Sequence, residues 1–195
     1  MSAERGGSAV PLPDDLPRLP PRPRDSHKGT FGTVVVVGGS CGDGAVMLGA
    51  PALSGLEALR TGCGLCKLAM PAPLLPHALA ICPSATGLAM PADESGRIEP
   101  HEASAAMDRC LDQATCLAIG PGLGISPGAQ AAVLRAIGQD DKPVVIDADA
   151  LNALGHISEF RRDFRAAAVL TPHPGEFARL VAAMGIKGDL GLAQS

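Results

Sequence analysis

The chain has 195 residues, which is long enough for one globular domain with a substantial core and short for two. Hydrophobic residues make up 46% of the sequence but aromatic residues only 2%, so small aliphatic side chains must build the core, as in layered α/β proteins. A net charge of −4 offers no basic surface for nucleic acid, and no apolar run approaches the roughly 20 residues that cross a bilayer. The N-terminus lacks the layout of a signal peptide, so we expect a cytoplasmic protein with neither nucleic-acid nor membrane partners.

Residues 1–26 differ in composition from the rest of the chain. They carry six prolines and scattered charges, and such a segment cannot bury enough surface to fold alone. We expect an extended N-terminal arm, docked on the body of the protein or on a neighbouring subunit. Residues 27–195 are then expected to belong to a single domain.

Five short apolar segments alternate with helical patterns. Their aliphatic and β-branched residues and their glycine or proline ends predict buried parallel strands over 33–38, 64–70, 115–120, 143–147 and 167–171. Helices are expected over 44–60, where Pro51 bends the helix or marks its beginning, over 127–137 and over 176–183. This alternation predicts an α/β fold with a mostly parallel central sheet flanked by helices. Residues 84–104 have the weakest pattern and are expected to include a surface excursion.

The six cysteines leave three interpretations open for one pair. Most cysteines of a cytoplasmic protein are small buried hydrophobes. Cys63 and Cys66 have the spacing of a redox motif and could also be half of a zinc site. Residues 64–70 read as a strand, however, whereas a redox motif of this kind begins a helix, and no second pair of ligands follows. Plain core thiols are therefore the favoured interpretation.

Four loops follow the carboxyl ends of predicted strands, where open α/β sheets bind their ligands. The first, residues 38–44, is rich in glycine, so its amides can approach a phosphate at a helix N-terminus. It lacks the Lys-Ser/Thr of a P-loop and the G-x-G-x-x-G spacing, so a tight turn without ligand is an equally good interpretation. The second, Gly-Pro-Gly-Leu-Gly over 120–124, is either a contact loop or a simple connector.

The third and fourth loops carry polar side chains. In Asp-Ala-Asp-Ala-Leu-Asn over 147–152, we expect Asp149 to cap a helix. The two carboxylates and the carboxamide could also hold Mg²⁺-phosphate or ribose hydroxyls. In Thr-Pro-His-Pro-Gly-Glu over 171–176, two prolines frame His173. Such a frame holds the imidazole at low entropic cost, which favours a role in orienting a ligand over a role in packing.

Five motifs follow one another along the chain. They are Ser-His-Lys-Gly-Thr-Phe-Gly over 26–32, Gly-Gly-Ser over 38–40 with Gly44-Ala45, Gly-Pro-Gly-Leu-Gly over 120–124, Asp-Ala-Asp-Ala-Leu-Asn over 147–152 and Leu-Thr-Pro-His-Pro-Gly-Glu over 170–176. In this order they resemble one family, the ADP-dependent (S)-NAD(P)H-hydrate dehydratases of the ribokinase-like superfamily. The resemblance covers residues 16 to 181.

The resemblance implies a ribokinase-like fold and repair of a damaged cofactor. Members of the family dehydrate the S-epimer of hydrated NADH or NADPH with ADP as co-substrate and Mg²⁺, releasing AMP and phosphate. Carried over to this sequence, Ala45, Gly122 and His173 would contact the hydrated dinucleotide. Asp147 and Asn152 would lie near the phosphates and Mg²⁺. A homotetramer is also implied.

The sequence departs from the family pattern in two places. Family members continue with a lysine-glycine strand and a G-[ST]-G-D-x-L motif, whose aspartate activates the hydroxyl and whose glycines bind ADP. Neither motif occurs in this chain, and Asp189 comes too early and in the wrong frame to replace that aspartate. In the first loop, Cys-Gly-Asp-Gly over 41–44 replaces a longer segment that precedes Gly-Ala in the family. We therefore expect an incomplete C-terminal side of the domain, no catalytic residue in the chain, no turnover by the isolated chain, and an exposed sheet edge that favours aggregation.

Two other functions stay open at this point. One is a small-molecule kinase of the same superfamily, for example for a hydroxymethylpyrimidine or a sugar, against which the Pro-His-Pro-Gly-Glu motif argues. The other is a nucleotide-binding remnant without catalytic activity, active only with a partner chain if at all. A Rossmann dehydrogenase is disfavoured, because no ribose-reading acid follows a second strand.

Overall fold

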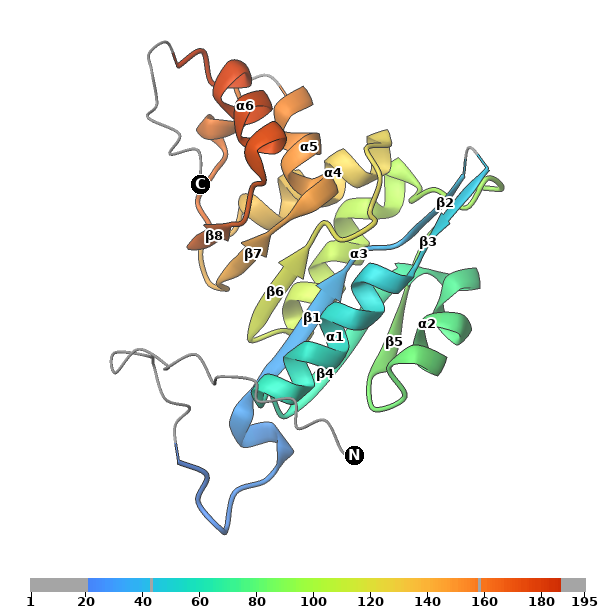
Figure 1. The fold of residues 1–195 in the computed structure, drawn as a ribbon, viewed down its shortest axis with the longest axis vertical. Coiled ribbons are helices and arrows are strands. Elements are labelled where there is room, and N and C mark those ends of the chain that lie inside the picture. Colours follow the sequence, from blue (N-terminus) through green and yellow to red (C-terminus); the bar gives the residue numbers. More distant parts are fainter. Residues whose placement is uncertain (1–20, 43, 158, 187–195) are drawn as a thin grey trace, which may run out of the picture.

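Six strands form one parallel sheet in the order β5-β4-β1-β6-β7-β8 (Figure 1). The computed structural model describes residues 21–42, 44–157 and 159–186. In chain order the strands are β1 (Thr33–Val37), β4 (Leu65–Pro71), β5 (Thr86–Met90), β6 (Cys116–Ile119), β7 (Val144–Ile146) and β8 (Ala168–Leu170). A separate antiparallel hairpin consists of β2 (Ser40–Gly42) and β3 (Ala45–Met47).

Two hydrophobic cores lie on the two faces of this sheet. In β1, Val35 and Val37 belong to the larger core and Val36 to the smaller one, and all three are completely buried. Successive side chains of a strand point to opposite faces, so a strand buried on both faces must be apolar throughout. This requirement explains the unbroken run of valines at the centre of the sheet.

The helices are divided unequally between the two faces (Figure 1). On one face, α1 (Gly49–Thr61) and α2 (Leu75–Ile81) pack on β1, β4 and β5. On the other face, α3 (Pro100–Gln113), α4 (Pro127–Ile137), α5 (Ala148–His156) and α6 (Pro174–Ala183) pack side by side. Short 3₁₀ turns lie at Lys28–Phe31, Ala72–Leu74 and Phe160–Arg162. No helix in the described part of the chain is long and apolar enough to cross a membrane.

Strands β6, β7 and β8 carry no helix from the described residues on the face that α1 and α2 occupy. Val36, Ala118, Val145 and Val169 share this face, because they are register partners in neighbouring strands. Val145 borders a mainly apolar hollow of about 470 Å³ beside α1, and Val169 is 61% exposed. This open face is therefore apolar, which is unusual for a surface in contact with water.

The starts of two predicted helices need correction. The helix expected over 44–60 begins only at Gly49, because Gly42 and Gly44 take positive φ angles and turn the chain into the β2–β3 hairpin. Pro51 marks this later beginning, since it lies in the first turn of α1. Residues 84–104 include the edge strand β5 and the start of α3, and the expected surface excursion is the exposed turn between them, which the bridge between Ala92 and Ile98 closes. Helix α6 begins at Pro174 rather than at residue 176. The helices α2 and α3 were not predicted, and α5 was anticipated only through the expected helix cap at Asp149.

The five predicted strands and the helix over 127–137 are confirmed, with ends that move by one or two residues. The prolines explain several of the helix starts. Pro127 and Pro174 each occupy the first helical position, where an N–H would have no intrahelical partner. In α4 the preceding Ser126 completes the signal, because its hydroxyl accepts a hydrogen bond of 3.2 Å from the Ala129 amide.

The motif over 26–32 lies at the amino ends of the strands, far along the sheet from the loops that follow them. His27 caps the 3₁₀ turn, because its Nδ1 accepts a hydrogen bond of 3.2 Å from the Gly29 amide. A Cβ at Gly64 would overlap the carbonyl oxygen of Lys28, so the motif packs directly on the start of β4. Its role here is structural. Of the predicted N-terminal arm, residues 1–20 lie outside the described residues, and Arg22 is held by Gly62 and by the ring of Phe31.

All six cysteines are free thiols. Cys66 is buried in β4, and burial raises its pKa to about 12. Burial also raises the pKa of the Cys63 thiol, which lies in the turn before β4. Redox and metal-binding cysteines need an accessible thiolate. No cluster of three or more metal-ligating side chains occurs among the described residues, so both observations favour core thiols over a redox or zinc site.

Candidate functional site

The strand order creates a crevice between β1 and β6. The chain passes from β1 to β4 and β5 on one side and then crosses over to β6, β7 and β8 on the other. The loops after β1 and β6 therefore leave the sheet in opposite directions, and open parallel sheets bind their ligands at this point. Two of the four loops that the sequence singled out, residues 38–44 and 120–124, meet here.

The loops after β1, β6 and β7 pack against one another through their main chains. The Gly39 amide donates a hydrogen bond of 3.0 Å to the carbonyl oxygen of Pro121. A Cβ at Gly38 would overlap that same oxygen, and a Cβ at Gly120 would overlap the carbonyl oxygen of Asp147. Gly120 also has a φ of +127°, which side-chain-bearing residues rarely adopt. The glycines of these motifs are therefore required for packing between the loops.

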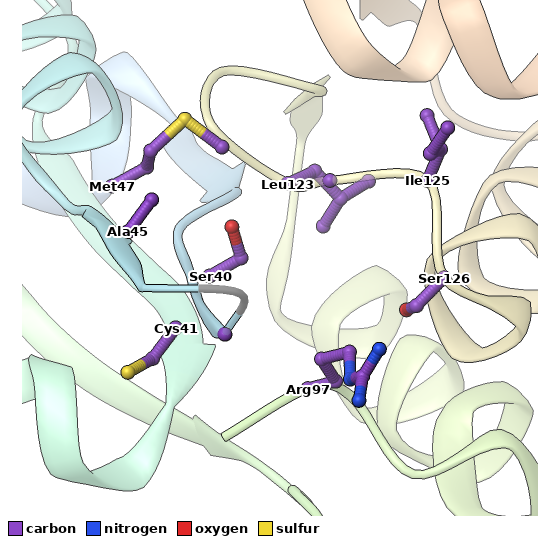
Figure 2. A pocket seen from close by; sticks show the side chains of 10 residues that line it. Ser40, Cys41, Ala45, Met47, Arg97, Leu123, Ile125 and Ser126 are labelled. Carbon is purple, nitrogen blue, oxygen red and sulfur yellow. The ribbon is translucent and has the colours of Figure 1, made fainter. Parts of the chain in front are cut away.

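A cavity of about 400 Å³ lies between the β2–β3 hairpin and the loop that follows β6 (Figure 2). Ala45 lines it from the hairpin, and Leu123 and Ser126 line it from the loop. A Cβ at Gly122 would lie 3.0 Å from the Cβ of Met47, so Gly122 closes the seam between the same two segments. The structure thus brings Ala45 and Gly122 to one place, as the family resemblance implies.

The cavity is mainly apolar, with a few polar groups. The apolar wall consists of Met47, Leu123 and Ile125, and the polar groups include the hydroxyls of Ser40 and Ser126. Arg97 contributes a guanidinium group to this cavity (Figure 2). Ligand pockets commonly combine an apolar lining with a small number of oriented polar groups.

Sequence reasoning missed both Arg97 and Ser126. The Ser-Pro step at 126–127 is a recognisable helix start and could have been found. Arg97 stands in the segment with the weakest pattern, and only the folding of the chain brings it to the hairpin.

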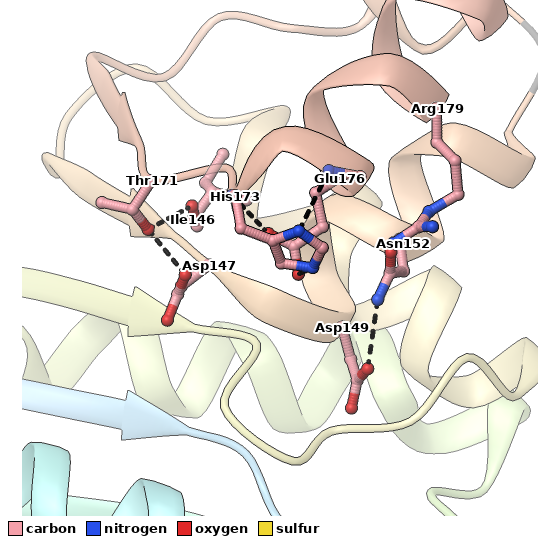
Figure 3. A network of polar contacts seen from close by, with 9 residues as sticks. Ile146, Asp147, Asp149, Asn152, Thr171, His173, Glu176 and Arg179 are labelled. Atoms are coloured by element: carbon pink, nitrogen blue, oxygen red, sulfur yellow. Dashed lines mark hydrogen bonds and ion pairs between the residues drawn. The ribbon is translucent and has the colours of Figure 1, made fainter. Parts of the chain in front are cut away.

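A polar network ties the loop after β6 to α5 and α6 (Figure 3). The Gly124 amide donates a hydrogen bond of 2.9 Å to Asp149 Oδ2. Asn152 Nδ2 donates to Asp149 Oδ1 over 3.4 Å, and Arg179 Nε donates to Asn152 Oδ1 over 3.0 Å. The prediction that Asp149 caps α5 is wrong, because Asp147 occupies the N-cap position and Asp149 reaches back to the glycine loop. Asp149 therefore positions the loop that lines the cavity.

Asp147 lies apart from this cavity. Its Oδ1 accepts a hydrogen bond of 2.7 Å from the Thr171 hydroxyl, and both residues line the apolar hollow on the open face of the sheet. The next residue, Ala148, has a φ of +48°, a left-handed conformation that costs a residue with a Cβ about 1 kcal/mol. The backbone is thus held in a strained turn directly after Asp147, whose carboxylate lines this hollow beside Thr171.

His173 is held rigidly at the N-terminus of α6. Its Nδ1 accepts a hydrogen bond of 3.0 Å from the Gly175 amide, so the neutral ring carries its proton on Nε2. Nε2 lies 3.2 Å from Oε1 of Glu176, while Oε2 of the same carboxylate accepts a hydrogen bond of 3.0 Å from the His173 amide. The Glu176 side chain is buried, whereas the imidazole is 61% exposed. The ring is therefore fixed in orientation and open to a ligand, although it does not line the cavity beside Ala45.

Comparison with known proteins shows the family to which the chain belongs. The sequence profile of the NAD(P)H-hydrate dehydratase family matches residues 34–194. The chain belongs to this family. It is 37% identical over 194 residues to a bifunctional NAD(P)H-hydrate repair enzyme of Salinibacter ruber, an alignment that covers 96% of this chain and 34% of that protein. It is 36% identical to the ADP-dependent (S)-NAD(P)H-hydrate dehydratase of Neisseria meningitidis, with 82% of this chain and 49% of the relative covered.

Solved structures confirm the ribokinase-like fold of this family member. An ADP/ATP-dependent NAD(P)H-hydrate dehydratase of Bacillus subtilis, co-crystallised with ATP and Mg²⁺, matches with a TM-score of 0.62 at 33% identity, covering 84% of this chain and 52% of that one. A ribokinase-like superfamily protein of Enterococcus faecalis matches with a TM-score of 0.63 at 26% identity over 83% of this chain and 52% of that one. The chain spans about a third to a half of the length of these proteins.

The main-chain packing around Gly120 leads to a stability prediction. We expect Gly120→Ala to lower the free energy of unfolding by about 2–3 kcal/mol, because its Cβ would overlap the Asp147 carbonyl oxygen and its φ is positive. Gly49→Ala is the matched control, since nothing lies within 4 Å of the added Cβ at the start of α1. Chemical denaturation measures both, and equal stability of the two variants would contradict the proposed packing.

The Asp149 network leads to a prediction about local order. Asp149→Ala should lower the free energy of unfolding by about 1.5–3 kcal/mol, because the Gly124 amide then loses a charged acceptor. Hydrogen exchange should show the Gly124 amide losing protection more than amides in β1. Asp140→Ala, at an exposed position, should change neither measurement appreciably. Unchanged protection of Gly124 in Asp149→Ala would show that the contact does not hold the loop.

Proposed function

We propose that this chain forms the dinucleotide-binding part of an enzyme that dehydrates the S-epimer of hydrated NADH or NADPH with ADP. The observation that carries the proposal is the cavity at the β1–β6 crevice, built by the family's own glycine motifs in a chain that belongs to the family. The activity itself is taken from the names of two longer relatives, of which the alignments cover 34% and 49%.

The chemistry of the proposed reaction explains why a kinase-like fold would serve a dehydration. Transfer of the terminal phosphoryl group of ADP to the hydroxyl of the hydrate forms a phosphate ester and releases AMP. Elimination then breaks the carbon–oxygen bond and removes a proton from the neighbouring carbon. The carbon–carbon double bond of the nicotinamide ring is restored, and the original hydroxyl oxygen leaves in the phosphate.

Three residues are proposed to contact the hydrated dinucleotide: Ala45, Gly122 and His173. Ala45 supports this role because its small side chain faces the cavity from the exposed strand β3. Gly122 supports it because it is partly exposed and directly precedes Leu123 and Gly124, which line the cavity. His173 supports it because its ring is 61% exposed and fixed in orientation by Gly175 and Glu176, so the ring itself is open to a ligand.

Asp147 is the candidate ligand for Mg²⁺ bound to the phosphates of ADP. Protein sites for this ion use one or two carboxylates, with substrate phosphates and water completing the shell. Asp147 fits because its Oδ1 accepts a hydrogen bond from Thr171 while its Oδ2 has no hydrogen-bond partner among the described residues, and because it lines the hollow on the open face. Asn152 fits less well, because both polar atoms of its side chain already have partners in Asp149 and Arg179. Bound there, the ion would neutralise charge on the transferring phosphoryl group.

The cellular location and the oligomeric state are also part of the proposal. Six free thiols are typical of a reducing compartment, which supports a cytoplasmic location. A homotetramer is proposed from the family resemblance alone.

The proposal is tested by binding rather than by turnover. Isothermal titration of the chain with the S-epimer of hydrated NADPH should give a measurable dissociation constant, and Ala45→Leu should raise it at least about tenfold by filling the cavity. Val46→Leu is the matched control, since the neighbouring residue is exposed and does not line the cavity. Equal effects of the two substitutions, or absence of binding by the unchanged chain, would contradict the proposal.

Turnover gives a separate check on where the chemistry lies. No G-[ST]-G-D motif occurs in the 195 residues, so we expect hydrated NADPH and ADP to yield no AMP above the level of heat-killed protein. Production of AMP by this chain would show that another group in it activates the hydroxyl. Phosphorylation of a hydroxymethylpyrimidine or a sugar with ATP would instead indicate a small-molecule kinase.

A further inference from the structure

We propose that Arg97 binds a phosphate group of the hydrated dinucleotide and thereby helps to select it. This inference rests on the proposed function and extends it to a residue outside the family motifs found in the sequence. Arg97 is the one charged side chain among the described residues that line the cavity. The proposed ligand carries several negatively charged phosphate groups. The guanidinium in this otherwise apolar and hydroxyl-lined cavity can therefore pair with one of them.

A short turn fixes the backbone of Arg97. Asp93 Oδ1 accepts hydrogen bonds from the Ser95 amide over 2.9 Å, from the Ser95 hydroxyl over 2.6 Å and from the Arg97 amide over 3.0 Å. The hydroxyl of Ser95, followed by the amide of Arg97, holds the pKa of the Asp93 carboxyl below its ordinary value. A bridge between Ala92 and Ile98 closes the turn. The turn is therefore ordered by its own hydrogen bonds, before any ligand arrives.

The same turn is docked on the hairpin that carries Ala45. A Cβ at Gly96 would lie 2.8 Å from the Cβ of Cys41 and 3.3 Å from its carbonyl oxygen, so the turn packs closely against strand β2 of the hairpin. A Cβ at Gly42 would lie 3.4 Å from Cγ of Arg97, which places the aliphatic stem of the arginine over the hairpin. This packing directs the side chain along the cavity wall instead of leaving it free in water (Figure 2).

The hydrogen bonds of the guanidinium leave its outer edge available. Nε donates to the Ser95 hydroxyl over 2.8 Å and lies 4.0 Å from Asp93 Oδ2. The two terminal nitrogens have no hydrogen-bond partner among the described residues, and the side chain is 45% exposed. Two parallel N–H groups on a planar, permanently charged fork match two oxygens of a phosphate. The geometry of Arg97 is thus suited to bidentate contact with a phosphate in the cavity.

The opposite side of the cavity supports the same ligand chemistry. Figure 2 shows the guanidinium turned toward Ser126, which caps the 11-residue helix α4. The first turn of a helix carries a partial positive charge and favours an anion nearby. An oxyanion between Arg97 and Ser126 would therefore meet favourable charge from both sides.

Two phosphate-bearing parts of the ligand are candidates for the contact with Arg97. They are the pyrophosphate, which NADH and NADPH share, and the 2′-phosphate, which only NADPH carries. Calorimetric titrations of the S-epimers of hydrated NADH and hydrated NADPH into the unchanged chain and Arg97→Gln distinguish them. Arg162→Gln is the control, because this exposed arginine pairs with Glu159 away from the cavity.

We expect Arg97→Gln to weaken binding about tenfold or more, as loss of a charge-assisted contact does. An effect on both ligands assigns Arg97 to the pyrophosphate, and an effect on hydrated NADPH alone assigns it to the 2′-phosphate. Arg97→Lys should restore only part of the affinity, because an ammonium cannot make the bidentate contact. Circular dichroism and thermal unfolding should show that the variants remain folded.

The outcomes separate this inference from the proposed function. If the unchanged chain binds either ligand and Arg97→Gln binds it equally well, the assignment of Arg97 is wrong and the proposed function stands. If the unchanged chain binds neither ligand, the proposed function fails and the assignment fails with it.

Discussion

Main-chain packing between the loops after β1, β6 and β7 is the constraint on which the rest of the site depends. A Cβ at Gly38 would overlap the carbonyl oxygen of Pro121, and a Cβ at Gly120 would overlap that of Asp147, while the Gly39 amide donates a hydrogen bond to the same Pro121 oxygen. Because these contacts involve backbone on both sides, no rearrangement of side chains can relieve a substitution. The glycines fix the three strand ends relative to one another, and this packing also determines where the polar residues that follow them lie.

Two separate regions are built on this base. On one side of the crevice, the hairpin, the glycine loop and the Asp93–Arg97 turn enclose the cavity in which a dinucleotide is proposed to bind. On the other, Asp147 and Thr171 face the open side of the sheet, where the proposed ADP and Mg²⁺ would approach. Asp149 links the two regions, since it extends from α5 to hold the Gly124 amide. Such a division suits a reaction in which one bound molecule transfers a phosphoryl group to another.

The central strands could be predicted from the sequence because burial on both faces demands unbroken apolar runs, as in β1. The edge strand β5 could not, since Thr-Gly-Leu-Ala-Met contains a glycine and is only partly buried. The hairpin over 40–47 escaped prediction because its short, exposed strands are stabilised by pairing with each other and by packing on the turn before α3. Arg97 and the Asp149–Gly124 contact depend on distant segments meeting, which no local pattern reveals.

A hydrated dinucleotide is proposed to bind at the β1–β6 crevice. Titration of the ¹⁵N-labelled chain with the S-epimer of hydrated NADPH, followed through amide chemical shifts by NMR, locates the binding site residue by residue. If the dinucleotide binds there, the largest shifts should occur at Gly39, Ala45, Gly122 and Gly124, with little change at Gly29 and Gly64 at the opposite end of the sheet. Shifts confined to that opposite end, or a saturating ligand that moves none of the four crevice amides, would contradict this proposal.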